Sequence, residues 1–129
     1  MNAQPPLVTA TDFVFVPVRR FAEAAEFYEK TLGLACSTRY EKVPGGEFET
    51  GNLTLLLLEA AAIGREFAPN QGAIALHVDD VASARAALEA SGVSFQGDTI
   101  DSGVCHQAIF ADPDGNTLIL HHRYAPRRV

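Results

Sequence analysis

Cysteine is scarce in this sequence of 129 residues, which contains only Cys36 and Cys105. The two cysteines lie far apart, and neither a Cys-x-x-Cys pair nor a dense cysteine pattern indicates a zinc site or a disulfide framework. We interpret both as free thiols in a reducing compartment, with one disulfide as the alternative.

Long hydrophobic runs are also absent. The longest apolar stretch, residues 53–63, is interrupted by Thr54 and Glu59 and is too short to span a bilayer. The first residues lack the positive segment and apolar run of a secretory signal. From these absences we expect a soluble protein located in the cytoplasm.

Basic residues are fewer than acidic residues. The chain has 10 Lys and Arg against 16 Asp and Glu, for a formal net charge of -6. Because phosphate backbones and anionic lipid headgroups repel such a protein, neither a nucleic acid nor a membrane surface is an expected partner. With 47% hydrophobic and 20% charged residues, the composition predicts one globular domain with a sizeable core.

Several catalytic motifs are missing as well. The sequence contains no nucleophile elbow and no glycine-rich loop of the kind that cradles phosphate. Two pairs of neighbouring acids, at residues 79–80 and at Asp112 and Asp114, are explained by helix capping and turn formation. The residues alone therefore assign no catalytic group.

The most informative stretch that is present is Asp112-Pro113-Asp114-Gly115-Asn116. Pro113 presets φ for a turn, Asp112 is able to cap the backbone, and Gly115 permits a left-handed conformation. Because strand-like segments lie on both sides of this stretch, we predict a β-hairpin.

The order of the expected elements repeats once along the chain. A shift of 60 residues brings Val18 onto Val78, and one deletion then brings Gly33 onto Gly92, so each expected helix ends at a glycine. We expect strands at residues 12–18, 35–42, 47–50, 53–59, 73–78, 93–96, 104–111 and 117–123, helices at 21–32 and 81–91, and turns at 44–46 and 51–52. This pattern predicts an α+β fold made of two βαβββ repeats.

The domain boundaries follow from the repeat. We expect a single domain over residues 10–123, with repeat one at about 11–60, repeat two at about 72–123, and flexible ends at 1–9 and 124–129. The apolar alternation places one set of side chains under the helices, namely Val14, Val16, Val18, Ile74, Leu76, Val78, Leu118 and Leu120. The opposite set comprises Phe13, Phe15, Ala73, Ala75, His77, Thr117, Ile119 and His121.

A family resemblance follows from these motifs. The Phe27-Tyr28 and Leu32-Gly33 pairs, the start of the second helix and the closing hairpin at residues 112–116 resemble the vicinal-oxygen-chelate superfamily, which includes glyoxalase I, extradiol dioxygenases and bleomycin-resistance proteins. The resemblance implies a curved mixed sheet around a ligand cavity, with the helices outside. It also implies a homodimer.

Enzymes of this superfamily hold a divalent metal with His, Gln or Glu side chains from four strands. By resemblance, three of these ligand positions fall on Phe13, Ala73 and Ile119, and the fourth falls near Leu56. Although a register slip in the run of residues 53–58 would bring Glu59 closer to the fourth position, Phe13, Ala73 and Ile119 have no donor atoms. We therefore expect that this chain lacks the metal site of the superfamily and holds no cofactor.

The leading functional hypothesis is a small-molecule binding protein similar to the bleomycin-resistance proteins, which sequester a drug. We expect an aromatic or cationic ligand, because aromatic walls provide stacking area, the chain is acidic overall, and histidines provide polar contacts. The candidate ligand-binding residues are Phe13, Phe15, His77, Ile119 and His121.

Two alternatives stay open at this point. One is a metal-dependent lyase, isomerase or dioxygenase with a nonstandard site built from His77 and His121, together with Glu59 or His106. The other is a sensor or structural subunit in which the cavity is vestigial, because a fold does not by itself determine a function.

Overall fold

The computed structural model describes residues 5–127, and residues 1–4 and 128–129 of the ends expected to be flexible lie outside the described residues. The first module consists of β1 (Phe13–Val18), α1 (Phe21–Glu26), β2 (Ala35–Arg39), β3 (Gly45–Glu49) and β4 (Thr54–Glu59). The second consists of β5 (Ile74–His77), α2 (Val81–Ala90), β6 (Phe95–Asp101), β7 (Cys105–Ala111) and β8 (Thr117–Arg123). The predicted tandem βαβββ order is confirmed.

Each module forms its own four-stranded sheet. The strand orders are β1-β4-β3-β2 and β5-β8-β7-β6, so the two modules have the same topology. In each sheet the first strand pairs in parallel with the last strand, and the remaining pairs are antiparallel. The α+β class is confirmed, with the eight strands divided between two mixed sheets.

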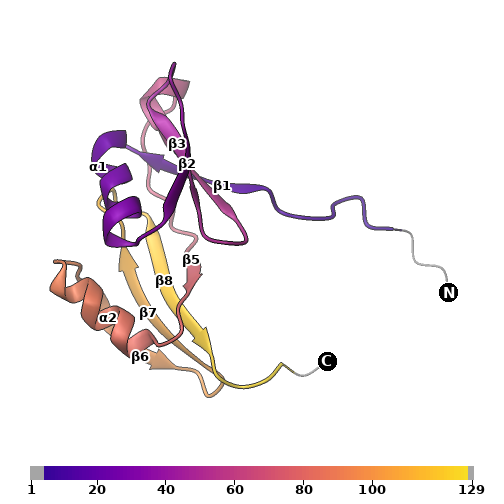
Figure 1. Ribbon diagram of the computed structural model, residues 1–129, viewed down its shortest axis with the longest axis vertical. Helices are drawn as coiled ribbons and strands as arrows, with labels where there is room; N and C mark the ends of the chain where they lie inside the picture. Colours follow the sequence, from indigo (N-terminus) through magenta and orange to yellow (C-terminus); the bar gives the residue numbers. More distant parts are fainter. Residues whose placement is uncertain (1–4, 128–129) are drawn as a thin grey trace.

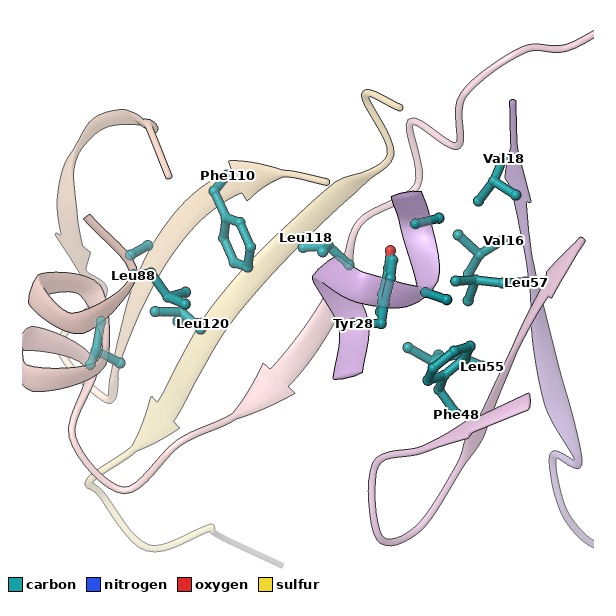
Figure 2. Close-up of a cluster of buried hydrophobic side chains, with 14 residues drawn as sticks. Val16, Val18, Tyr28, Phe48, Leu55, Leu57, Leu88, Phe110, Leu118 and Leu120 are labelled. Atoms are coloured by element: carbon teal, nitrogen blue, oxygen red, sulfur yellow. The ribbon is translucent and has the colours of Figure 1, made fainter. Parts of the chain in front are cut away.

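Both helices lie on one side of the sheets, to the left of the strands in Figure 1, while residues 5–12 extend away on the other side. All eight side chains predicted to lie under the helices belong to the hydrophobic core or pack against it. Figure 2 shows one group of buried side chains around Tyr28 and another around Phe110, with Leu118 between them. Among residues 5–127, no helix is long and apolar enough to cross a membrane.

The two helices begin by different means, and each is followed by a glycine with positive φ. Asp80 caps α2 as predicted, because its carboxylate accepts a hydrogen bond from the Ala82 amide at 3.1 Å. Arg20 provides no such cap for α1, and the Glu59 carboxylate accepts from the Phe21 amide at 2.9 Å instead. Gly33 follows the first helix at a φ of +76°, as expected for a glycine at this position.

The helix predicted over residues 21–32 is only partly α-helical. Residues Phe27–Thr31 form a π-helical turn, in which the Leu32 amide donates to the Phe27 carbonyl at 3.0 Å. Apolar periodicity does not separate the two forms in so short a segment, since both place Tyr28 in the core.

The turn predicted at residues 44–46 is wrong for two of its three positions, because Gly45 and Gly46 belong to β3. Both glycines are buried where the neighbouring backbone comes close. A Cβ on Gly45 would lie 2.7 Å from the Leu57 carbonyl oxygen, and one on Gly46 would lie 2.7 Å from the Thr38 carbonyl oxygen. These glycines are therefore required by close strand packing and not by a turn.

The closing hairpin has the predicted turn chemistry. Asp112 Oδ1 accepts hydrogen bonds from the Asp114 and Asn116 amides, each at 2.9 Å. Gly115 has a φ of +90°, in the left-handed region that favours glycine.

The same hairpin also joins the two modules. The Tyr28 hydroxyl of the first module donates to Asp112 Oδ2 at 2.7 Å. The Asn116 amide group donates to the Pro17 carbonyl at 2.9 Å, and Asn116 Oδ1 accepts from the Asn70 amide at 2.7 Å. Tyr28 is fully buried and Asp112 is only 5% exposed, so this junction is a buried polar network.

Candidate functional site

The side of each sheet that faces away from the helices is called here its open face. On the first sheet, the register aligns Phe13 of β1 with Thr54 of β4 and then with Glu49 of β3. Residues paired across neighbouring strands project to the same side of a sheet. An aromatic ring and a carboxylate therefore share this row, separated by two strand spacings, or about 9–10 Å.

A second row of the first open face repeats this arrangement. Phe15 pairs with Leu56, which pairs with Glu47. Phe15, Leu56 and Glu47 are all half-buried, whereas Phe13 is 53% exposed at the end of β1. The first open face thus has an apolar, aromatic edge on β1 and an acidic strip on β3.

The two carboxylates of this strip are held by neighbouring hydroxyl groups. Ser37 and Thr54 donate hydrogen bonds to Glu49, and these bonds lower the pKa of the Glu49 carboxyl group. The Tyr40 hydroxyl donates to Glu47, and burial together with this contact raises the pKa of Tyr40 to about 12. Near neutral pH this face therefore presents an ionised Glu49 and an uncharged tyrosine.

Glu47 and Glu49 were not among the residues predicted for the site. Their signal was nevertheless present in the sequence, because Glu47-Phe48-Glu49 alternates with the period of a strand. Phe48 is fully buried in the core, so the glutamates on either side must project to the opposite face.

The second open face carries the other three predicted site residues. Ile119 of β8 pairs with Ala75 of β5, and His121 pairs with His77. Ile119 and His121 are half-buried, and the His77 side chain is 69% exposed. His77 Nε2 lies 3.3 Å from Asp79 Oδ1, so the last residue of β5 has its polar contact with an exposed carboxylate two positions further along the chain.

Of the residues considered for a nonstandard metal site, His77 and His121 are paired in register, but neither Glu59 nor His106 joins them. The Glu59 carboxylate, in the first module, accepts a hydrogen bond from the Phe21 backbone amide. His106 pairs in register with His122, one residue away from His121, so it projects to the helix side and not to the open face. Among residues 5–127, no group of three or more His, Cys, Asp or Glu side chains is arranged to hold a metal ion.

A hollow of the described chain lies where the two modules meet, and Ala75 and His77 of the second open face are the only open-face residues of β5 in its lining. It has a volume of about 320 Å³ and is bordered by the end of the first helix, the β3–β4 turn and strand β5. We call it the junction hollow, because both modules contribute to it. His77 is part of its lining, whereas Phe13 and His121 are not.

This location differs from the expected cavity between the concave faces. Within one described chain, each open face is an uncovered surface and not the wall of an enclosed cavity, because both helices pack on the other side of the sheets. The five predicted site residues are therefore divided between two sheets, two of them on the first and three on the second.

Comparison with known proteins assigns the chain to a family. The profile of the Glyoxalase/Bleomycin resistance protein/Dioxygenase superfamily matches residues 10–120. No curated protein sequence matches the chain significantly.

Solved structures share the fold at low sequence identity. A member of the same superfamily from Sphaerobacter thermophilus DSM 20745 is 22% identical, with a TM-score of 0.76 over 90% of this chain and 98% of that chain. TnmS3, an antibiotic binding protein from Streptomyces sp. CB03234, is 24% identical, with a TM-score of 0.75 over 92% and 99%. Lactoylglutathione lyase from Agrobacterium tumefaciens is 20% identical, with a TM-score of 0.71 over 92% and 95%.

Proposed function

Because this chain belongs to the glyoxalase/bleomycin resistance protein/dioxygenase superfamily, we propose that it is a member that binds a small organic molecule without the metal of the superfamily. The binding surface that we propose is the first open face, where Phe13 and Phe15 lie opposite Glu47 and Glu49. The structural similarity to an antibiotic binding protein is consistent with such a role.

The metal of the superfamily does not fit the side chains at its expected positions. Phe13, Leu56 and Ile119 are hydrocarbon side chains on β1, β4 and β8, and Ala73 precedes β5. A hard or borderline divalent cation needs oxygen, nitrogen or sulfur donors. These four side chains therefore offer no ligand to a metal ion, and the proposed function is binding without catalysis.

The single observation that carries the proposal is the pairing of aromatic and acidic side chains across β4. A ligand with an aromatic group and a positive charge about 9–10 Å apart matches the two ends of the Phe13–Thr54–Glu49 row. The stacking partner is half-exposed, and Glu49 is kept ionised by two hydroxyl donors. This geometry favours cationic aromatic molecules over anionic ones.

A fluorescent ligand pair tests this proposal. Dansylcadaverine has an aromatic group and an ammonium group at the end of a flexible arm, and the dansyl amide of 6-aminohexanoate has a carboxylate there instead. We expect dansylcadaverine to bind more tightly, and we expect Phe13→Ala to weaken its binding about fivefold, since a lost aromatic contact contributes about 1 kcal/mol. Glu49→Gln should weaken it about threefold, as expected for a solvent-accessible charge pair.

Matched control variants distinguish binding at this site from non-specific binding of the dansyl ligands elsewhere on the protein. Tyr124→Ala removes a similarly exposed aromatic side chain from the second module, and Glu23→Gln removes an exposed carboxylate from α1. Both should leave the fluorescence titration unchanged. Equal binding of the two dansyl ligands, or equal loss in Phe13→Ala and Tyr124→Ala, would contradict the proposal.

The metal-free part of the proposal has its own measurement. Elemental analysis of the pure protein, as isolated and after anaerobic loading with iron, manganese, nickel and zinc, should find no metal near one ion per chain. A stoichiometric metal ion would mean that other side chains hold it, and His77 and His121 would then be the first residues to replace.

We also propose that the protein is a homodimer and that it is located in the cytoplasm. In this dimer the second open face, with His77, Ile119 and His121, contributes to ligand binding. The first strand of each module supports the idea of a partner, because β1 and β5 are edge strands within the described chain. Edge strands have unpaired backbone groups that a second copy is able to cover. Sedimentation velocity should show twice the chain mass of 13.8 kDa, and a monomer at all concentrations would exclude the dimer.

A further inference from the structure

We infer that the junction hollow is a second binding site, separate from the first open face, for one uncharged aliphatic molecule with a hydrogen-bond acceptor at one end. The hollow shares no residue with the first open face, so it can be tested separately from the aromatic and acidic surface proposed there, and His77 is the one residue that it has in common with the proposed contribution of the second open face.

The walls of the hollow belong to the apolar interior of the protein. Leu55 of the first module is fully buried, and Leu120 of the second is 3% exposed. Leu34, Ile74 and Leu76 are half-buried and pack against the core on the helix side of the sheets. A molecule in the hollow would thus extend the hydrophobic core across the junction of the two modules.

The size of the hollow suits a small molecule. An apolar cavity of roughly 150 Å³ holds one benzene molecule. The junction hollow, at about 320 Å³, is close to the lower limit of ordinary ligand pockets. It therefore matches a short aliphatic chain better than a strand or helix of a partner protein.

The polar groups of the lining specify the charge of the ligand. Thr50, Asn52 and His77 provide the polar side chains, and no Asp, Glu, Lys or Arg lines the hollow. Asn52 Oδ1 already accepts a hydrogen bond from the Thr50 hydroxyl at 3.1 Å, which leaves the Asn52 amide nitrogen to donate. A charged group would lose its hydration here without a counterion, so a hydroxyl or carbonyl end is favoured.

Aliphatic probes of different charge test the inference by titration calorimetry. We expect 1-octanol to bind with one molecule per chain and to raise the thermal midpoint, while octanoate and octylammonium bind more weakly. Leu34→Trp places a large ring in the hollow and should weaken 1-octanol binding by about tenfold or more. Leu53→Trp fills the same hollow from the β3–β4 turn, so the test survives if one variant does not fold.

Leu7→Trp is the matched control, because Leu7 is 98% exposed on the N-terminal segment. It should bind 1-octanol as the unchanged protein does. Phe13→Ala should also leave 1-octanol binding unchanged, and Leu34→Trp should leave dansylcadaverine binding unchanged. The failure of one site is therefore distinguishable from the failure of the other.

Three outcomes would overturn the inference. The first is the absence of saturable 1-octanol binding, and the second is equal binding by the Leu34→Trp and Leu7→Trp proteins. The third is a change of oligomeric state in Leu34→Trp and Leu53→Trp without any 1-octanol binding to the unchanged protein. That result would show that a second copy of the chain, and not a small molecule, covers the hollow.

Discussion

Replacing Asp112 by alanine is expected to lower the free energy of unfolding by about 3–4 kcal/mol, because the change leaves several buried donors without an acceptor. The Asp112 carboxylate accepts from the Tyr28 hydroxyl, the Asn116 amide group and two backbone amides of its own hairpin. These donors are buried or half-buried, so water does not readily replace the lost contacts.

Urea unfolding followed by circular dichroism measures this effect, with Asp98→Ala as the control. Asp98 is an exposed aspartate on β6, and its replacement should change the unfolding free energy by no more than about 0.5 kcal/mol. Because Tyr28 and Asp112 belong to different modules, amide exchange in Asp112→Ala should also increase on both sides of the junction. A loss equal to that of Asp98→Ala would show that the network does not stabilise the junction.

The second large effect is a loss of stability at alkaline pH that depends on Tyr28. Burial raises the pKa of the Tyr28 hydroxyl far above its ordinary value of 10.0, and the neighbouring Asp112 carboxylate adds to the shift. Above about pH 10 the unfolded chain releases this proton while the folded chain keeps it. The folded state is therefore progressively disfavoured, by up to about 1.4 kcal/mol per pH unit.

The Tyr28→Phe variant isolates this proton. At pH 8 it should be less stable than the unchanged protein by about 1–2 kcal/mol, because the Asp112 carboxylate loses one donor. Between about pH 10 and pH 11.5 the difference should shrink and then reverse, since phenylalanine has no proton to release. Tyr40 and Tyr124 are present in both proteins, so their titration cancels. A difference that stays constant over this range would contradict the assignment.

The first open face and the junction hollow share no residue, although the hollow includes Ala75 and His77 of the second open face. The open face combines charge and aromatic surface where solvent has access, and the junction hollow is apolar and lined by residues of the core. A cationic aromatic ligand and an uncharged aliphatic ligand are therefore expected to bind without competing.

Much of the fold was predictable from local patterns. The alternation in β1 placed Val16 and Val18 under the helices, and the Asp80 cap and the hairpin at residues 112–116 formed as expected. These features depend on a period of two or on the chemistry of a few neighbouring residues, so a short window of sequence contains enough information. The same reasoning also assigned Phe13 and Ile119 to the helix-free face.

The misassigned features depend on contacts between distant parts of the chain. Gly45 and Gly46 read as a turn, yet the close approach of other strands requires them inside β3. Asp112 read as a turn residue only, because its bond to Tyr28 spans 84 positions and has no local signature.

The sequence by itself thus determined the repeat and the direction in which each strand presents its side chains. Only the tertiary structure decided how the modules join, where the hollow lies and that Glu49 shares a row with Phe13. The physical reason is that strand pairing and module packing depend on the burial of side chains that are far apart in the sequence. A short window of sequence does not contain these contacts, because they form only when the whole chain folds.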